Sequence, residues 1–391
     1  NHKGREVNKT MKNRNKLLGF LAFAMYFLTG ASCVVVGSSL PQLVDMYGIG
    51  LDKVALLGSA YALGRVLTVY ITGRMVEKIG PLKVLAIGAA LTGAYLLGIP
   101  LIVNYYAGML FAVLGGIGMG TQDAVTPVLL SMVFKKNYSS ALSGGQTLFG
   151  IGTSVTPFLI GVMLSGKLPF YYSYFVLAAV AIVIFVLTFF AKETEEIAEE
   201  TEEHIQPLYT KKPYVVYVGI FLVVAAFSAV SSAIGLYTSS FAISRGVSEA
   251  SAAFMFTLYN IGCVIGGAVF VIVLKYIKSQ TVLLMNCMVA FIAILGAMSI
   301  NKTPVYFIGL FIAGLFLGVL FSVIVSIATR IGYKRISVAS SLVATASGFA
   351  DFFTPVITGV VIASLGIDFS YIFALIMLAA VSYTHLTLPT T

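Results

Sequence analysis

Charged side chains are scarce in this sequence. Asp, Glu, Lys and Arg make up 10% of its 391 residues, whereas 59% are hydrophobic and the mean hydropathy is +0.99. A soluble globular chain carries about 25% charged residues. No soluble core could bury so much apolar surface, so the composition excludes a soluble fold. It predicts an all-α, polytopic membrane protein whose apolar helix faces are solvated by lipid.

Histidine and cysteine are also rare. The three histidines, His2, His204 and His385, lie outside the long apolar runs, which excludes a histidine relay within a membrane. The three cysteines lie inside apolar runs without a CxxC pair, so we expect packing residues and neither a disulfide framework nor a metal site. The spans contain no nucleophile–base set, and the chain has no Walker A sequence. We therefore expect no enzyme activity, no cofactor and no ATP drive within this chain.

Basic residues outnumber acidic ones and give a formal net charge of +9. A basic chain can bind nucleic acid, but here the basic residues lie between the apolar runs. Of the 24 Lys and Arg residues, 19 precede the first run or follow an even-numbered run. By the positive-inside rule these segments, the N-terminus included, face the cytoplasm of a bacterial-type (inner) cell membrane. The expected partner is thus the lipid bilayer and not nucleic acid.

Eleven apolar runs are long enough to cross a bilayer, which takes about 20 residues per helix. They cover 17–40, 54–73, 82–103, 107–133, 139–165, 170–191, 214–243, 250–274, 281–300, 304–329 and 336–365, and a twelfth begins near Ser370. Seven glutamates between 193 and 203 divide the runs into two sets.

These runs predict the domain organisation of the chain. We expect an N-terminal cytoplasmic segment (1–16), an N-terminal six-helix bundle (17–191), an acidic cytoplasmic linker (192–212) and a C-terminal helical bundle (213–380). Residues 381–391 are similar to a translated sequencing adapter. We therefore expect a non-native tail there that cuts the last helix short.

The two halves repeat each other at a constant offset of 198 residues. The pattern GxxxxxTPxxxG begins at Gly150 and again at Gly348. The same offset relates further pairs: Gly37 and Gly235, Tyr61 and Tyr259, Gly64 and Gly262, Gly116 and Gly314, and Gly120 and Gly318. Parallel repeats with a site between them are a transporter architecture. We expect the glycines to allow close helix packing and Pro157 and Pro355 to bend their helices.

The segment after the second run reads G-R-M-V-E-K-I-G-P-L-K over residues 73–83. It resembles the loop signature G-x-L-A-D-R-x-G-R-K of the major facilitator superfamily. Gly73, Glu77, Lys78 and Gly80 fall on its glycine, acidic, basic and glycine positions. The resemblance implies a fold of twelve transmembrane helices in two six-helix bundles and transport of a small-molecule substrate by alternating access. It also implies a gating role for this loop, and we expect a monomer.

Two signatures of proton-coupled drug exporters in that family are missing. Ala112 stands where the helix-4 signature has Arg, and Thr156-Pro157 begins a segment that lacks the G-P-x-x-G-G pattern. The segment from Gln122-Asp123 to Thr126-Pro127 is loosely similar to fucose/glucose-type sugar permeases. This favours a solute transporter, with a drug or metabolite exporter and a non-transporting membrane sensor as the alternatives.

Three charged residues lie deep within the predicted spans: Arg65, Asp123 and Asp351. Each costs at least about 2.5–3.5 kcal/mol in a membrane, so each is a functional candidate. A carboxyl group in low-dielectric surroundings is protonated more easily, which makes Asp123, and next Asp351, a candidate proton carrier. Arg65 either holds an anionic substrate or pairs with Asp123, and a purely structural pair is the alternative.

Polar and aromatic residues on the expected cavity helices are further substrate candidates. They are Tyr26, Gln42, Tyr61, Gln122, Gln146, Ser231, Tyr237, Tyr259 and Asn260. Each alone is equally explained by helix–helix hydrogen bonding. The combined prediction is a secondary active transporter, coupled to a proton, for a small polar solute such as a sugar or an organic acid.

Overall fold

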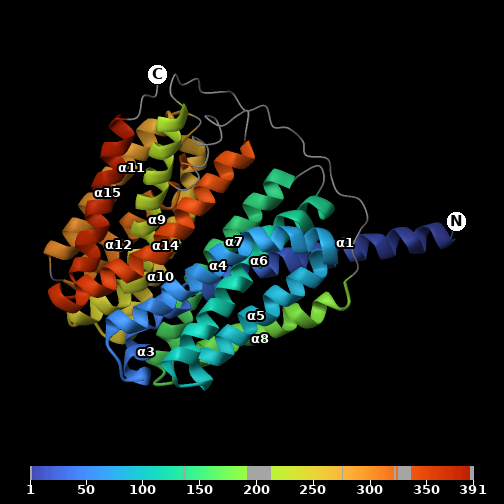
Figure 1. The fold of residues 1–391 in the computed structure, drawn as a ribbon, viewed down its shortest axis with the longest axis horizontal. Helices are drawn as coiled ribbons and strands as arrows, with labels where there is room; N and C mark the ends of the chain where they lie inside the picture. The colour runs from blue at the N-terminus through green and yellow to red at the C-terminus, as the bar shows by residue number, and fades with distance from the viewer. Residues whose placement is uncertain are drawn as a thin grey trace.

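The structure is a computed structural model that describes residues 2–134, 138–191, 213–274, 276–300, 302–320, 323–324 and 336–387. Helices form nearly all of these residues, as Figure 1 shows, and the described ranges contain no strand. The acidic linker predicted over 192–212 lies outside them. So do residues 388–391 of the predicted tail, whereas its earlier part continues a helix.

The described residues of the first half form eight helical segments. They are α1 (His2–Cys33), α2 (Val35–Ser38), α3 (Leu40–Tyr47), α4 (Leu51–Ile79), α5 (Pro81–Leu101), α6 (Tyr105–Val133), α7 (Tyr138–Ser165) and α8 (Tyr172–Thr188). The second half forms α9 (Pro213–Ser244), α10 (Glu249–Val273), α11 (Ser279–Ser299), α12 (Thr303–Leu317), α14 (Ile336–Leu365) and α15 (Phe369–Thr387). Each half has its own apolar core, and the first core also takes in Leu236, Tyr237 and Ala253 of the second half.

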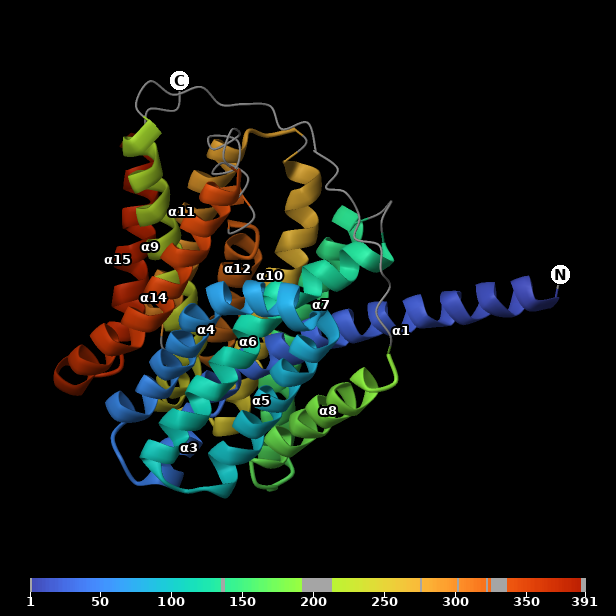
Figure 2. The ribbon, with the colours of Figure 1, turned by 45° about the vertical axis from the view of Figure 1, so that its right-hand side comes forward.

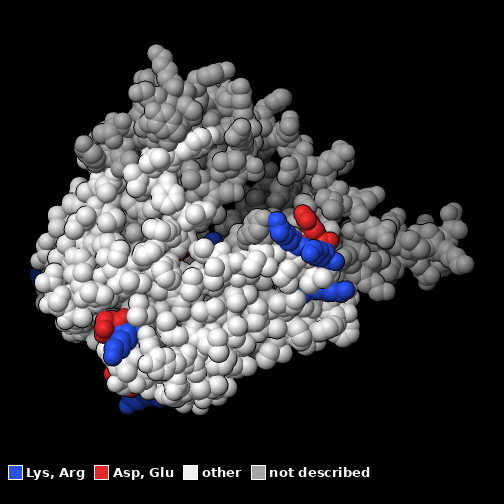
Figure 3. All heavy atoms as spheres, viewed as in Figure 1, with Lys and Arg blue, Asp and Glu red and all other residues white. Residues whose placement is uncertain are grey.

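Many of these helices have the length and the apolar composition of membrane-spanning helices. Among the described residues, seven helices are long and apolar enough to cross one, and three shorter apolar helices accompany them. Figure 3 shows one face of the molecule, where charged side chains gather mainly at the lower left and at the right, and the broad surface between them carries few charges. The predicted all-α membrane fold is confirmed.

The first predicted span, 17–40, is not one continuous helix. It breaks at Val34 and again at Ser39, so α1, α2 and α3 follow one another. The break at Ser39 has a local cause, because Pro41 stands in the first turn of α3 and has no N–H to continue the helical hydrogen bonds of α2. Sequence analysis missed this because the run was ended at residue 40, directly before Pro41.

The repeat of 198 residues is also a repeat of helix crossings. A Cβ atom added to Gly64 of α4 would overlap the backbone oxygen of Val113 of α6, and one added to Gly262 of α10 would overlap that of Phe311 of α12. The partners are related by the same offset as the glycines. Gly116 against the oxygen of Tyr61 and Gly314 against that of Tyr259 form a second matched pair. Backbones this close require glycine, as expected from the sequence.

The two halves meet mainly at the end that carries α3. Gly37 of α2 lies against the backbone of Gly235 of α9, and Gln42 Nε2 donates to Glu249 Oε2 over 2.7 Å. Figures 1 and 2 show the halves converging at this end and diverging toward the end where α8 ends and α9 begins. Contact at one end and separation at the other is one of the two arrangements that alternating access requires.

The glycine crossings give a direct test of the packing. Replacing Gly116 or Gly314 by Ala forces the Cβ against a backbone oxygen, and overpacking of this kind costs about 1–3 kcal/mol. We therefore expect a lower Tm for both purified variants in detergent. Gly296→Ala in α11 is the matched control, because nothing lies within 4 Å of its added Cβ. It should leave the Tm unchanged or raise it, and equal losses in all three variants would contradict the crossing geometry.

Candidate substrate and proton site

Three charged side chains from three helices meet between the two halves. Arg65 comes from α4, Asp123 from α6 and Asp351 from α14. The Nε atom of Arg65 donates to Asp123 Oδ2 over 2.8 Å, and one terminal nitrogen of the same guanidinium lies 3.7 Å from Asp351 Oδ2. The side chains are 28%, 29% and 31% exposed. The structure thus forms the expected Arg65–Asp123 pair and adds a carboxylate from the other half.

Glycine packing brings the first two charges within reach of each other. Gly64, next to Arg65, lies against the backbone of α6, and a Cβ atom on Gly116 would crowd the backbone of Tyr61 and Arg65. Asp123 follows Gly116 by seven residues, about 10.5 Å along the same helix. Larger residues at these glycines would push α4 and α6 apart and lengthen the Arg65–Asp123 contact.

The three charges are unequally compensated. One guanidinium faces two carboxylates, so the group carries a formal charge of −1 when both acids are ionised. Asp123 has a charge-assisted hydrogen bond of normal length, whereas the 3.7 Å contact of Asp351 exceeds hydrogen-bond distance. Asp351 is therefore the less firmly held carboxylate. A guanidinium has five N–H donors, so Arg65 also has hydrogen-bonding capacity for a solute.

The substrate candidates of the first half differ in their neighbours and in their burial. Tyr61 lies one helical turn from Arg65 on α4, and its ring centroid is 5.4 Å from that of Tyr95. Gln122 is buried and donates to Thr126 Oγ1 over 2.9 Å. Gln146 is exposed.

The candidates of the second half are buried against their own helix. Tyr259 is stacked on Phe256 with 6.0 Å between ring centroids. Asn260 is also buried and donates to the oxygen of Phe256 over 3.0 Å. Tyr61 lies one helical turn from Arg65 and Gln122 directly precedes Asp123, so these two candidates lie nearest to the charged group along the chain.

Sequence analysis missed one neighbour of the charges. Cys33, the last residue of α1, lies near Arg65, Asp123 and Asp351. Its half-buried thiol donates to the oxygen of Gly30 over 3.2 Å. The interpretation as a packing residue was therefore incomplete, since Cys33 also borders the charged group. No signal in the sequence indicates this place, because it depends on how α1 faces α4, α6 and α14.

The residues of the predicted gating loop lie mostly on a helix. Gly73, Glu77 and Lys78 belong to the last turns of α4. Gly80 separates α4 from α5 with a φ of 88°, a value that favours glycine. The two predicted helix-bending residues, Pro157 and Pro355, lie inside α7 and α14. Within the described part of the chain, no cluster of three or more His, Cys, Asp or Glu side chains could hold a metal ion.

The unequal contacts predict unequal stability losses. Asp123→Asn removes a charge-assisted hydrogen bond, a kind of contact that contributes about 1.5–3 kcal/mol. Asp351→Asn removes a longer contact, so we expect a smaller fall in the Tm of the purified protein. An equal or larger fall in Asp351→Asn would contradict the assignment of Asp123 as the principal partner of Arg65.

Two apolar helical bundles with a small charged group between them define the class of polytopic membrane transporters. The comparisons with known proteins agree. The family model of the Major Facilitator Superfamily matches residues 22–355. The chain belongs to this superfamily, and it is a membrane transporter and not an enzyme.

Two relatives that are named as transporters match most of the chain. The MFS-type transporter YfkL of Bacillus subtilis (strain 168) is 22% identical over 354 residues, which cover 89% of each chain. The inner membrane transport protein YdiN of Escherichia coli (strain K12) is 23% identical over 382 residues, covering 95% of this chain and 90% of YdiN.

Among solved structures, a D-xylose-proton symporter superposes with a TM-score of 0.74 at 12% identity, over 95% of this chain and 97% of the symporter. A bacterial homolog of the human lysosomal transporter Spinster, in an inward-facing and unoccupied conformation, gives 0.73 at 13% identity, over 95% and 96% of the two chains. At these identities the likeness shows the fold alone.

Proposed function

We propose that this protein is a proton-coupled secondary active transporter of a small polar solute, such as a sugar or an organic acid. The observation that carries the proposal is one guanidinium, Arg65, placed between carboxylates of both halves. Charged groups within a membrane are costly and are retained where they bind ions or substrates. The D-xylose-proton symporter of the same fold is consistent with this mode of transport.

The proposal reverses the order favoured by the sequence: Asp351, whose contact with Arg65 is longer (3.7 Å against 2.8 Å), is the proton-binding carboxylate, and Asp123 is the lasting partner of Arg65. Protonation of Asp351 removes its charge and with it the attraction to Arg65 across the two halves. The formal charge of the group then rises from −1 to zero, which lowers the cost of enclosing it during the conformational change. Coupling follows because α14 separates more easily from α4 when the proton is bound.

Arg65 is the proposed contact for the solute. Its remaining N–H groups can donate to sugar hydroxyls, and an organic acid would compete with Asp351 for the guanidinium. Tyr61 is the neighbouring candidate on the same helix. Gln122, Gln146, Tyr259 and Asn260 stay candidates further along the path.

The orientation and the gate complete the proposal. By the positive-inside rule the N-terminus and the linker face the cytoplasm of a bacterial inner membrane, and YdiN is an inner membrane protein by name. The end where the halves diverge would then face inward. Gly73, Glu77, Lys78 and Gly80, at the junction of α4 and α5 on that side, form the proposed gate of a monomeric transporter.

Proteoliposomes with an internal pH dye test the proton assignment. A panel of sugars and organic acids is added at fixed membrane potential, and we expect one class to evoke proton movement by the unmodified protein. Asp351→Asn should abolish that proton movement while solute counterflow continues, since only the titrating group is lost. Persistent solute-evoked proton movement in Asp351→Asn would contradict the assignment.

Asp123→Asn is the matched control, and it should impair counterflow itself because Arg65 loses its principal partner. The same panel separates the alternatives. Solute extrusion against its gradient would indicate an exporter, and binding without flux would indicate a sensor.

A further inference from the structure

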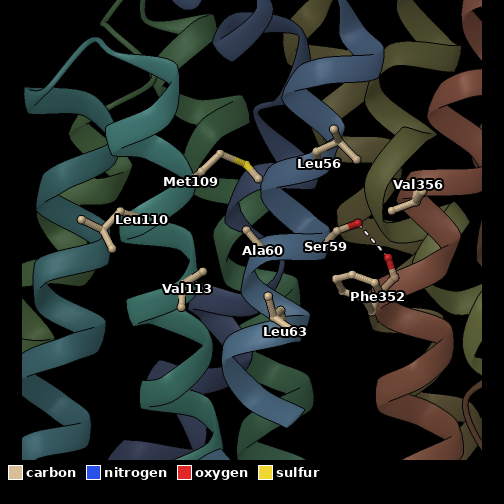
Figure 4. Close-up of a pocket in the computed structure, with 9 residues that line it drawn as sticks. All are labelled: Leu56, Ser59, Ala60, Leu63, Met109, Leu110, Val113, Phe352 and Val356. Carbon is tan, nitrogen blue, oxygen red and sulfur yellow. Dashed lines mark hydrogen bonds between the residues drawn. The ribbon is translucent and has the colours of Figure 1, made fainter. Parts of the chain in front are cut away.

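An apolar groove lies on the seam between the two halves. It has a volume of about 310 Å³ and is formed where α4, α6 and α14 meet. Nine residues line it: Leu56, Ser59, Ala60, Leu63, Met109, Leu110, Val113, Phe352 and Val356 (Figure 4). Arg65, Asp123 and Asp351 are not among them, so the groove is separate from the charged site.

The lining is almost entirely apolar, so it provides few hydrogen-bonding groups for a polar solute. Ser59 is the one residue of the lining with a polar side chain, and its hydroxyl donates to the backbone oxygen of Phe352 over 2.8 Å (Figure 4). A polar solute entering the groove would give up hydrogen bonds to water without replacement, which is unfavourable. The groove therefore suits a hydrocarbon occupant.

The surroundings of the groove indicate where that occupant comes from. Leu63 and Leu110 of the lining are exposed, and Leu110 is 60% exposed. Further exposed apolar residues lie on the helices that form the groove, among them Leu67 and Ile71 of α4 and Ile357 of α14. In a membrane-spanning chain such a surface faces lipid acyl chains, so the groove is continuous with the hydrocarbon of the bilayer.

We propose that one phospholipid acyl chain occupies this groove and stabilises the arrangement of the halves described here. Two walls belong to the first half and one to the second, and the Ser59–Phe352 hydrogen bond joins the halves at the groove. Movement of α14 relative to α4 changes the width of the groove. A ligand that fits one width better stabilises that conformation by its difference in affinity. The proposal rests on movement of the halves and not on proton coupling.

The absence of tryptophan from this chain makes a sharp test available. Leu110→Trp places the one tryptophan of that variant at the groove, and Val176→Trp places one on an exposed face of α8, a similar distance from the start of its helix. The purified proteins are titrated in detergent with phosphatidylcholine brominated on its acyl chains, which quenches nearby tryptophan. We expect quenching of Leu110→Trp to saturate as for a single site, while quenching of Val176→Trp rises in proportion to the lipid fraction.

A second variant fills the groove. Adding Val113→Phe to Leu110→Trp should abolish saturable quenching. Phosphatidylcholine should also raise the Tm of the unmodified protein more than that of Val113→Phe, and Val176→Phe should keep the full shift. If Val113→Phe fails to fold, the two single-tryptophan proteins still decide the matter. Identical lipid dependence in both would overturn the proposal, as would saturation by a free brominated fatty acid but not by the phospholipid.

Discussion

The rest of the structure depends on the contacts that the Arg65 guanidinium makes with two carboxylates. The guanidinium holds Asp123 at 2.8 Å within the first half and lies 3.7 Å from Asp351 of the second half. A buried ion pair loses stability when one partner is removed, because the remaining charge is left uncompensated. One cation facing two acids therefore has a firm contact inside one bundle and a weaker contact between bundles. The weaker contact is the one that a moving transporter can break.

The glycine crossings make this geometry available. In lipid no hydrophobic force brings helices together, so close packing of small residues has to supply the contact. Gly64 and Gly116 bring α4 against α6 beside Arg65, and Gly262 and Gly314 repeat the crossing between α10 and α12. The charged residues are not repeated. At the offset of 198 residues, Arg65 corresponds to Cys263 and Asp351 corresponds to Thr153. Two equivalent frameworks thus carry one charged group.

Much of this could be predicted from the sequence. Long apolar runs are a strong signal for spans, and the three charged residues within them were singled out because charge is costly in lipid. Pairing of Arg65 with Asp123 was one of the two alternatives that the sequence left open for Arg65. The contact of Asp351 with Arg65 and the place of Cys33 beside it could not be predicted, because both depend on how separate helices face each other. The breaks between α1, α2 and α3 lie at the end of a run that is long and hydrophobic enough to predict one continuous span.

The central claim is that protonation of Asp351 loosens the contact between the halves. It is tested most directly by the distance between spin labels at Ile87 of α5 and Leu222 of α9, measured as a function of pH by pulsed electron paramagnetic resonance. Both positions are exposed and belong to different halves. The account predicts that the distance distribution shifts with pH in the otherwise unmodified protein and no longer responds to pH in Asp351→Asn. The same pH-dependent shift in Asp351→Asn would contradict it.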